Sequence, residues 1–154
     1  MAMPNPRDFF VNLIIKRPAR KLTYADLIAR LAAGDTRIRA RIARATPSAG
    51  NSSALRHITG IERWSQRRLR TILGESPTTD EYDGYQPDPA TDWPALREEW
   101  AATRQETIAL TRQIAAAGIN DGTKAHHNGL GDLTAREWLV YLSSHASREA
   151  LRIR

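Results

Sequence analysis

Residues 133–149 read LTAREWLVYLSSHASRE, and this stretch decides the fold. Thr134 is a candidate helix N-cap, and Glu137 follows three positions later in the pattern of a capping box. The residues that share one broad face at helical spacing are Trp138, Leu139, Leu142, His145, Ala146, Glu149 and Ile153. The stretch therefore predicts an amphipathic helix with one face turned toward a core.

Three further segments have the same helical period. The first begins at the N-cap Thr23 and stops before the TPSAG sequence at 46–50. The second runs from about Ser52 to Leu73. The third starts at the DWP sequence at 92–94 and continues to Gly118. No segment reads convincingly as a β-hairpin, so we expect an all-α protein.

The connection between the second and third helices decides how the helices are ordered. Residues 75–92 are rich in Pro, Asp, Gly and Tyr, and they are too many for a tight turn between antiparallel neighbours. A crossover of this length lets the second and third helices run parallel. The prediction is a four-helix bundle over residues 21–154 with up-down-down-up topology. The start of the second helix then lies level with the end of the fourth.

Composition narrows the class of protein. The 154 residues suffice for one domain with a core, and the chain has no cysteine, so a metal site would have to use His, Asp, Glu or water. The apolar run at residues 9–15 is too short for a membrane helix and lacks a signal-peptide cleavage pattern. We therefore expect a cytoplasmic protein with no membrane partner.

Residues 1–20 read as an N-terminal arm outside the bundle. Its apolar run, Phe9 to Ile15, could add to the core or to a dimer interface. The net charge of +6 and the pI of about 10.3 raise the question of a nucleic-acid partner. The arginines are spread over every predicted helix without an aromatic-interleaved stripe, so we expect a solvated basic surface instead.

The candidate site consists of His57, His145 and Glu149. His57 lies about one turn into the second helix, and His145 and Glu149 are one turn apart on the same face of the fourth. The predicted helix directions bring the three together as a His2Glu site with open coordination positions, which suits Zn, Ni or Fe(II). The alternative is a hydrogen-bonded core histidine beside a glutamate that pairs with arginine. His126 and His127 lie in a glycine-rich stretch, 122–131, and we expect them at the surface.

Two stretches resemble the DinB/YfiT-like superfamily. They are LRHITGIERWSQRRL at 55–69 and HNGLGDLTAREWLVYLSSHASRE at 127–149. The resemblance implies a four-helix bundle, often a homodimer, whose divalent metal is held by three histidines. His57 and His145 match two of them, and Glu149 stands where the family has the third.

The same resemblance implies a function. Characterised relatives include transferases and isomerases that use a low-molecular-weight thiol such as mycothiol or bacillithiol. It suggests a metalloenzyme that activates water or a thiol for transfer or hydrolysis on a small-molecule substrate. The alternative is a non-catalytic, stress-related binding or scaffolding protein that has lost the family metal, because Glu149 replaces a histidine.

Overall fold

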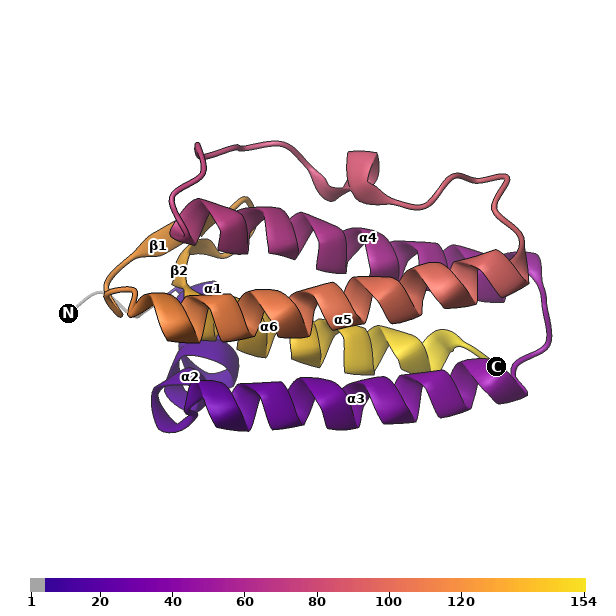
Figure 1. Cartoon of the computed structure of the whole chain (residues 1–154), viewed down its shortest axis with the longest axis horizontal. Helices are drawn as coiled ribbons and strands as arrows, with labels where there is room; N and C mark the ends of the chain where they lie inside the picture. Colours follow the sequence, from indigo (N-terminus) through magenta and orange to yellow (C-terminus); the bar gives the residue numbers. More distant parts are fainter. Residues whose placement is uncertain (1–4) are drawn as a thin grey trace.

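The computed structural model of the protein describes residues 5–154, and in this range the predicted all-helical class is confirmed (Figure 1). Every helix in the described chain is too short or too polar to span a lipid bilayer. The helices are α1 (Pro6–Val11), a π-helical segment (Asn12–Lys16), α2 (Arg17–Lys21), α3 (Tyr24–Arg44), α4 (Ala49–Ile72), α5 (Trp93–Ala117), α6 (Ala135–Glu149), and the short 3-10 segments Tyr82–Tyr85 and Ala150–Arg152.

Four long helices lie side by side along the molecule (Figure 1). Helices α3 and α6 run from left to right in this view, and α4 and α5 run from right to left. Helices α3 and α4 each contact both α5 and α6. As a consequence, the start of α4 and the end of α6 lie at the same end of the molecule.

Side-chain caps fix where the helices begin. Thr23 and Asp26 form a reciprocal capping box at the start of α3, with distances of 2.8 and 3.1 Å. Thr134 and Glu137 do the same at the start of α6, at 2.9 and 3.3 Å. The Asp92 carboxylate accepts a hydrogen bond from the third residue of α5 at 2.9 Å. These caps satisfy backbone N–H groups that the first helical turn leaves without an acceptor.

Helix α4 begins earlier than expected, at Ala49 and not near Ser52. The Ser48 hydroxyl accepts a hydrogen bond from the Asn51 N–H at 3.1 Å, so Ser48 is the N-cap. The Asn51 side chain also donates to the backbone oxygen of Arg154 at 2.6 Å. This bond ties the start of α4 to the segment that follows α6.

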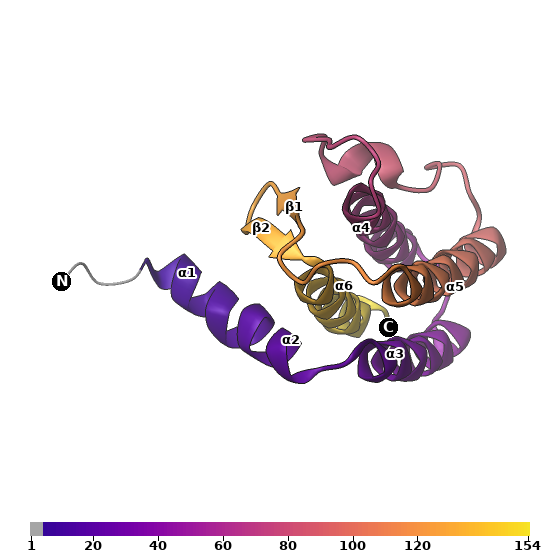
Figure 2. The ribbon, with the colours of Figure 1, turned by 60° about the vertical axis from the view of Figure 1, so that its left-hand side comes forward.

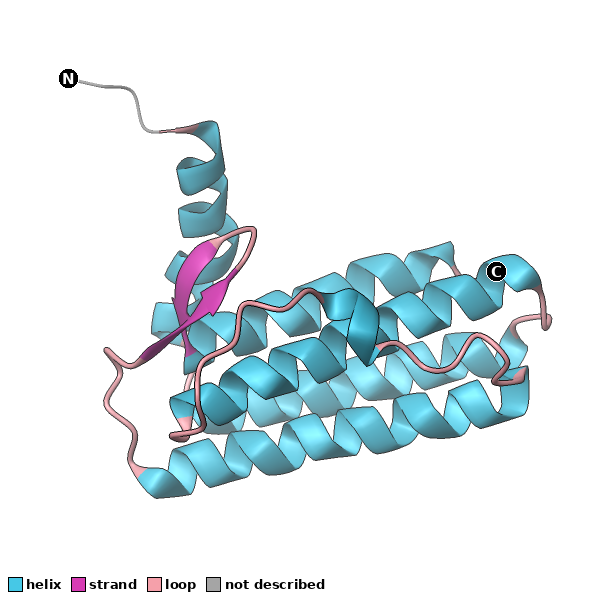
Figure 3. Ribbon diagram, turned by 90° about the horizontal axis from the view of Figure 1, so that it is seen from above, coloured by secondary structure: helices cyan, strands magenta, loops and turns pink. Residues whose placement is uncertain are grey.

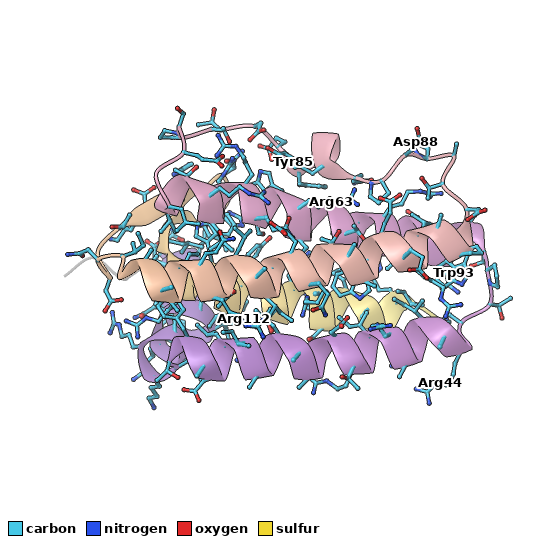
Figure 4. The ribbon with its side chains drawn as sticks, in the orientation of Figure 1. Arg44, Arg63, Tyr85, Asp88, Trp93 and Arg112 are labelled. Atoms are coloured by element: carbon cyan, nitrogen blue, oxygen red, sulfur yellow. The ribbon has the colours of Figure 1, made fainter. Side chains whose placement is uncertain are left out.

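The crossover between α4 and α5 is held against α4 by polar contacts. The Trp64 indole donates to the Asp80 carbonyl at 2.8 Å. The buried Arg68 guanidinium contacts the same residue, at 2.8 Å from its carboxylate and from its carbonyl oxygen. Tyr85, which Figure 4 shows on the crossover above α4, donates to that carboxylate at 2.6 Å. The long connection is therefore a fixed strap.

Further along, the strap touches α4 at Gly60. A Cβ atom at this position would lie 2.6 Å from the Gln86 side chain and 3.2 Å from its Cα. Because real Cβ atoms do not approach other atoms so closely, only glycine lets the strap rest directly on the helix. This contact places Gln86 next to the first half of α4.

The N-terminal arm is helical and projects from one end of the bundle (Figure 2). Its inner face packs into the core through Val11, Ile15 and Ala19. Its outer face is solvent-exposed at Phe9 (60%) and Phe10 (51%). Residues 1–4 of the predicted arm, 1–20, lie outside the described residues.

A small β-hairpin departs from the expected loop (Figure 3). Strands β1 (Lys124–His127) and β2 (Gly131–Thr134) pair antiparallel, with Lys124 opposite Thr134 and His127 opposite Gly131. The sequence did not predict it because each strand has only four residues and glycine interrupts the pattern. The hairpin leads directly into the Thr134 cap of α6.

Candidate functional site

His57 and His145 come together between α4 and α6. Their ring centroids are 5.2 Å apart, with planes tilted by 57°. Tyr82 of the crossover meets the His57 ring edge-on, at 5.4 Å between centroids. The sequence placed both histidines on core-facing stripes, and the antiparallel direction of the two helices brings the stripes to the same level. The aromatic contact with Tyr82 was not foreseen, because it depends on the path of the strap.

His145 has a nitrogen with no partner. The residue is 9% exposed, and its Nδ1 atom is buried without a hydrogen bond in the described chain. Burial, together with the neighbouring His57, lowers the pKa of His145 to about 4. The imidazole is therefore neutral at pH 7, which is the form that coordinates metals. A buried ring nitrogen without a partner costs free energy, so it marks a site for a ligand or a strained contact.

The Glu149 carboxylate forms ion pairs with two arginines. Its carboxylate accepts a hydrogen bond from Arg152 at 2.9 Å, and Arg148 approaches its other oxygen at 3.5 Å. The hydrogen bond from Arg152 is the main cause that lowers the pKa of Glu149, so the side chain is ionised. Within residues 5–154, no group of three His, Cys, Asp or Glu side chains lies close enough to hold a metal ion.

The side chains at this site are of types that bind divalent metals, and two of the three predicted ligands lie close together. Two imidazoles that face each other, one with a buried nitrogen free of hydrogen bonds, are a suitable pair of donors for Zn, Ni or Fe(II). The third predicted ligand, Glu149, lies one helical turn after His145 but pairs with Arg152. The structure thus brings His57 and His145 together, and Glu149 does not join them in a metal-holding group within residues 5–154.

A cleft of about 690 Å³ opens next to His57, between the start of α4 and the segment after α6. Its wall includes Gln86 of the strap together with Arg152 and Arg154. A volume of this size is typical of small-molecule sites. Sequence analysis did not single out these three residues as site residues; Gln86 reaches the cleft through the contact at Gly60, which no local pattern indicates.

His127 is buried, and the expectation that it lies at the surface is wrong. Its ring is 8% exposed and sits among Trp64, Trp138 and Tyr141 at centroid distances of 4.9, 5.0 and 4.6 Å. The reason is the alternation of side chains along β1, which turns neighbouring residues to opposite faces. His126 is exposed, as expected, and contacts the Asp132 carboxylate at 2.8 Å.

The hydrogen bonds of His127 mark it as structural. Its Nδ1 accepts from the N–H groups of Gly129 and Leu130 at 3.0 and 3.1 Å. The hydrogen of the neutral ring must therefore be on Nε2, which is buried against the aromatic rings without a hydrogen-bond partner in the described chain. Burial is the main cause that lowers its pKa to about 4. The ring thus closes the turn of the hairpin and fills the core.

Comparison with known proteins supports the resemblance read from the sequence. No curated protein and no solved structure matches the chain. The family model described as the DinB superfamily matches residues 44–149, more than half of the chain. The matched span contains α4, the strap, α5 and α6, together with His57 and His145, and it ends at Glu149. The protein belongs to the DinB superfamily.

Proposed function

We propose that the protein binds a divalent metal ion through His57 and His145, with Glu149 as the third ligand, in the up-down-down-up bundle of its family. The observation that carries the proposal is the buried Nδ1 of His145, which has no hydrogen-bond partner in the described chain and lies beside the ring of His57. Both histidines belong to the span that matches the family model. Glu149 lies one helical turn after His145 on α6, so a change of its side-chain rotamer away from Arg152 is what the proposal requires.

Glu149 can exchange its partners at small cost. Both of its arginines are largely exposed, 67% for Arg148 and 70% for Arg152. Ion pairs at such exposure contribute roughly 0–1 kcal/mol, because water and salt screen the charges. Coordination of a divalent ion by a carboxylate and two imidazoles is worth more than this, so the pair with Arg152 is not an obstacle to binding.

The chemistry that we propose is thiol-dependent transfer or hydrolysis on a small molecule. A divalent ion, when bound, supplies the Lewis acidity that activates water or a low-molecular-weight thiol at neutral pH. The residues of the chain supply the rest: His57 lines the cleft, and Tyr82 packs edge-on against its ring. The donor set suits Zn, Ni and Fe(II) alike.

Metal analysis tests this proposal. Protein without a histidine tag would be stripped with chelator and reloaded separately with Zn²⁺, Ni²⁺ or Fe²⁺ under anaerobic conditions. We expect stoichiometric metal in the wild type and in His126→Ala, which removes an exposed histidine, and loss of the metal in His145→Ala. Wild-type protein that retains none of the three ions would overturn the proposal.

A second candidate is a non-catalytic binding or scaffolding protein that has lost the family metal. The ion pair between Glu149 and Arg152 favours it, because it occupies the carboxylate. The two candidates differ in the response to Glu149→Gln. This substitution weakens metal binding if Glu149 is a ligand, and it changes only the stability if Glu149 is an ion-pair partner.

We also propose that the chain forms a homodimer through the outer face of its arm. Phe9, Phe10, Leu13 and Ile14 are between 42% and 60% exposed on adjacent turns. A contiguous exposed apolar surface of this kind is typical of an interface. Light scattering after gel filtration tests it: we expect a dimer for the wild type and a monomer for Phe10→Ser.

A further inference from the structure

The residues that line the cleft beside His57 favour one chemical class of ligand. The cleft wall contains the guanidinium groups of Arg152, which also pairs with Glu149 at 2.9 Å, and of Arg154, and no aspartate or glutamate side chain of the described chain lines it. The hydroxyl-bearing residues Thr46, Ser48 and Ser53 add hydrogen-bond donors. A concave surface with guanidinium groups and several other donors attracts anions, because the walls concentrate the positive potential.

The backbone at the start of α4 adds to this potential. No acidic residue lies in the first turn of this 24-residue helix, and the Gly50 N–H has no acceptor in the described chain. Gly50 lines the cleft, so its side of the helix is open to a ligand. The partial positive charge at a helix N-terminus then acts in the same direction as the two arginines.

The cleft is also connected to the proposed reaction centre. His57 lines it, and His145, which is nine-tenths buried and whose Nδ1 has no partner in the described chain, lies next to His57 at 5.2 Å between ring centroids. A molecule that fills the cleft therefore has one end near the arginines and the other end near the histidine pair. Guanidinium groups bind carboxylates and phosphates in bidentate geometry, which fixes orientation as well as position.

We propose that this cleft binds the oxyanion group, carboxylate or phosphate, of a small-molecule substrate. Arg152, Arg154 and the start of α4 hold the anion and direct the rest of the molecule toward His57. The inference rests on the proposed function, to whose substrate it assigns a chemical class. Arg152 of this site is also the ion-pair partner of the proposed metal ligand Glu149. The test therefore uses metal-free protein and Arg154, which forms no ion pair with a proposed ligand in the described chain, and each proposal can then fail without the other.

Titration calorimetry with metal-free protein tests the anion site. The probes are inorganic phosphate and succinate, at constant ionic strength, with the neutral diamide of succinate as a control. Arg154→Ala removes one guanidinium from the cleft. Arg112→Ala is the matched control, because it removes the same charge from α5 near the hairpin end of the molecule, far from the start of α5 at Trp93 (Figure 4).

We expect the wild type and Arg112→Ala to bind at least one of the two anions, with no binding of the diamide. Binding by Arg154→Ala should be weaker by roughly tenfold, the effect of one charge-assisted contact. Binding of phosphate alone indicates a phosphorylated substrate, and binding of succinate alone a carboxylate. Absence of binding by both anions, or equal binding by the two arginine variants, would refute the site. Neither result depends on metal content, which the reloading experiment measures separately.

Discussion

His127 and His145 are both buried, both near α6, and burial lowers the pKa of both to about 4, yet their surroundings differ. The Nδ1 lone pair of His127 is used by two backbone N–H groups, and aromatic rings enclose the ring. The Nδ1 of His145 has no partner in the described chain, and its neighbour His57 opens onto a cleft. Burial and a shifted pKa therefore do not identify a site by themselves. What distinguishes His145 is an Nδ1 atom without a partner in the described chain, next to a histidine that lines a cleft.

The largest expected effect is a difference in the stability that the surroundings of His127 and the surroundings of His57 and His145 contribute. Trp138→Ala removes a fully buried ring that stacks on His127 and should lower the free energy of unfolding by about 3–5 kcal/mol. His57→Ala removes a half-buried ring beside the cleft and should cost roughly 1 kcal/mol or less. Urea unfolding monitored by circular dichroism measures both. Equal losses would mean that the side chains around His57 are packed as tightly as the core around Trp138.

The second prediction concerns how the free energy of unfolding depends on pH through the enclosed His127. The pKa of His127 is about 4 in the folded protein and about 6.5 when unfolded, so the unfolded state binds the proton more readily. The stability from the neutral ring is complete above pH 6.5 and is lost as the pH falls toward 4. The loss amounts to roughly 3 kcal/mol.

Urea unfolding at pH 7 and pH 4 checks this value. His127→Gln should remove most of the pH dependence that His127 contributes, and His126→Gln, at an exposed position, should leave it unchanged. An unaltered pH dependence in His127→Gln would show that the ring does not titrate differently on folding.

The third prediction concerns metal binding at His145, which lies next to His57 and the cleft. If His145 binds a metal ion, free metal at about 100 times the dissociation constant should stabilise the wild type by roughly 2.7 kcal/mol. His145→Ala should gain nothing, whereas His127→Gln should gain the same increment from a lower starting stability. Thermal unfolding with and without metal measures the increments. A gain that follows His127 instead would reverse the roles of the two histidines.

The smallest expected effect comes from the partner of Glu149. Arg152→Ala should change the free energy of unfolding by less than about 1 kcal/mol, because the pair is exposed on the arginine side. It should also tighten metal binding by up to roughly fivefold, since the carboxylate no longer has to leave a cation. Arg112→Ala is the control for net charge. Weaker metal binding in Arg152→Ala would indicate that the arginine supports the site.

Local sequence signals predicted the helical framework well. Thr23 with Asp26 and Thr134 with Glu137 are short-range patterns, and both capping boxes form. The all-helical class and the membership of the family were also predicted correctly. Ser48, in contrast, was overlooked because several serines near the break at Pro47 compete for the role of cap.

The candidate site was only partly predictable. The meeting of His57 and His145 follows from helix direction and the period of each helix, which the sequence contains. The burial of His127 depends on rings from α4 and α6 that no local pattern connects to the hairpin. The pairing of Glu149 with Arg152 is an i, i+3 contact that the spacing allowed, but spacing alone does not choose between an ion pair and a ligand.

The contact between Gly60 and Gln86 has a consequence for how this protein could diversify. Because Gly60 has no side chain, the strap lies directly against α4 at this point. Gln86 of the strap also forms part of the cleft wall. A larger residue at position 60 would push Gln86 away from α4 and widen the entrance of the cleft, and it would also shift Tyr82 of the same strap against the His57 ring. The width of the cleft and the packing of His57 are therefore coupled through one glycine.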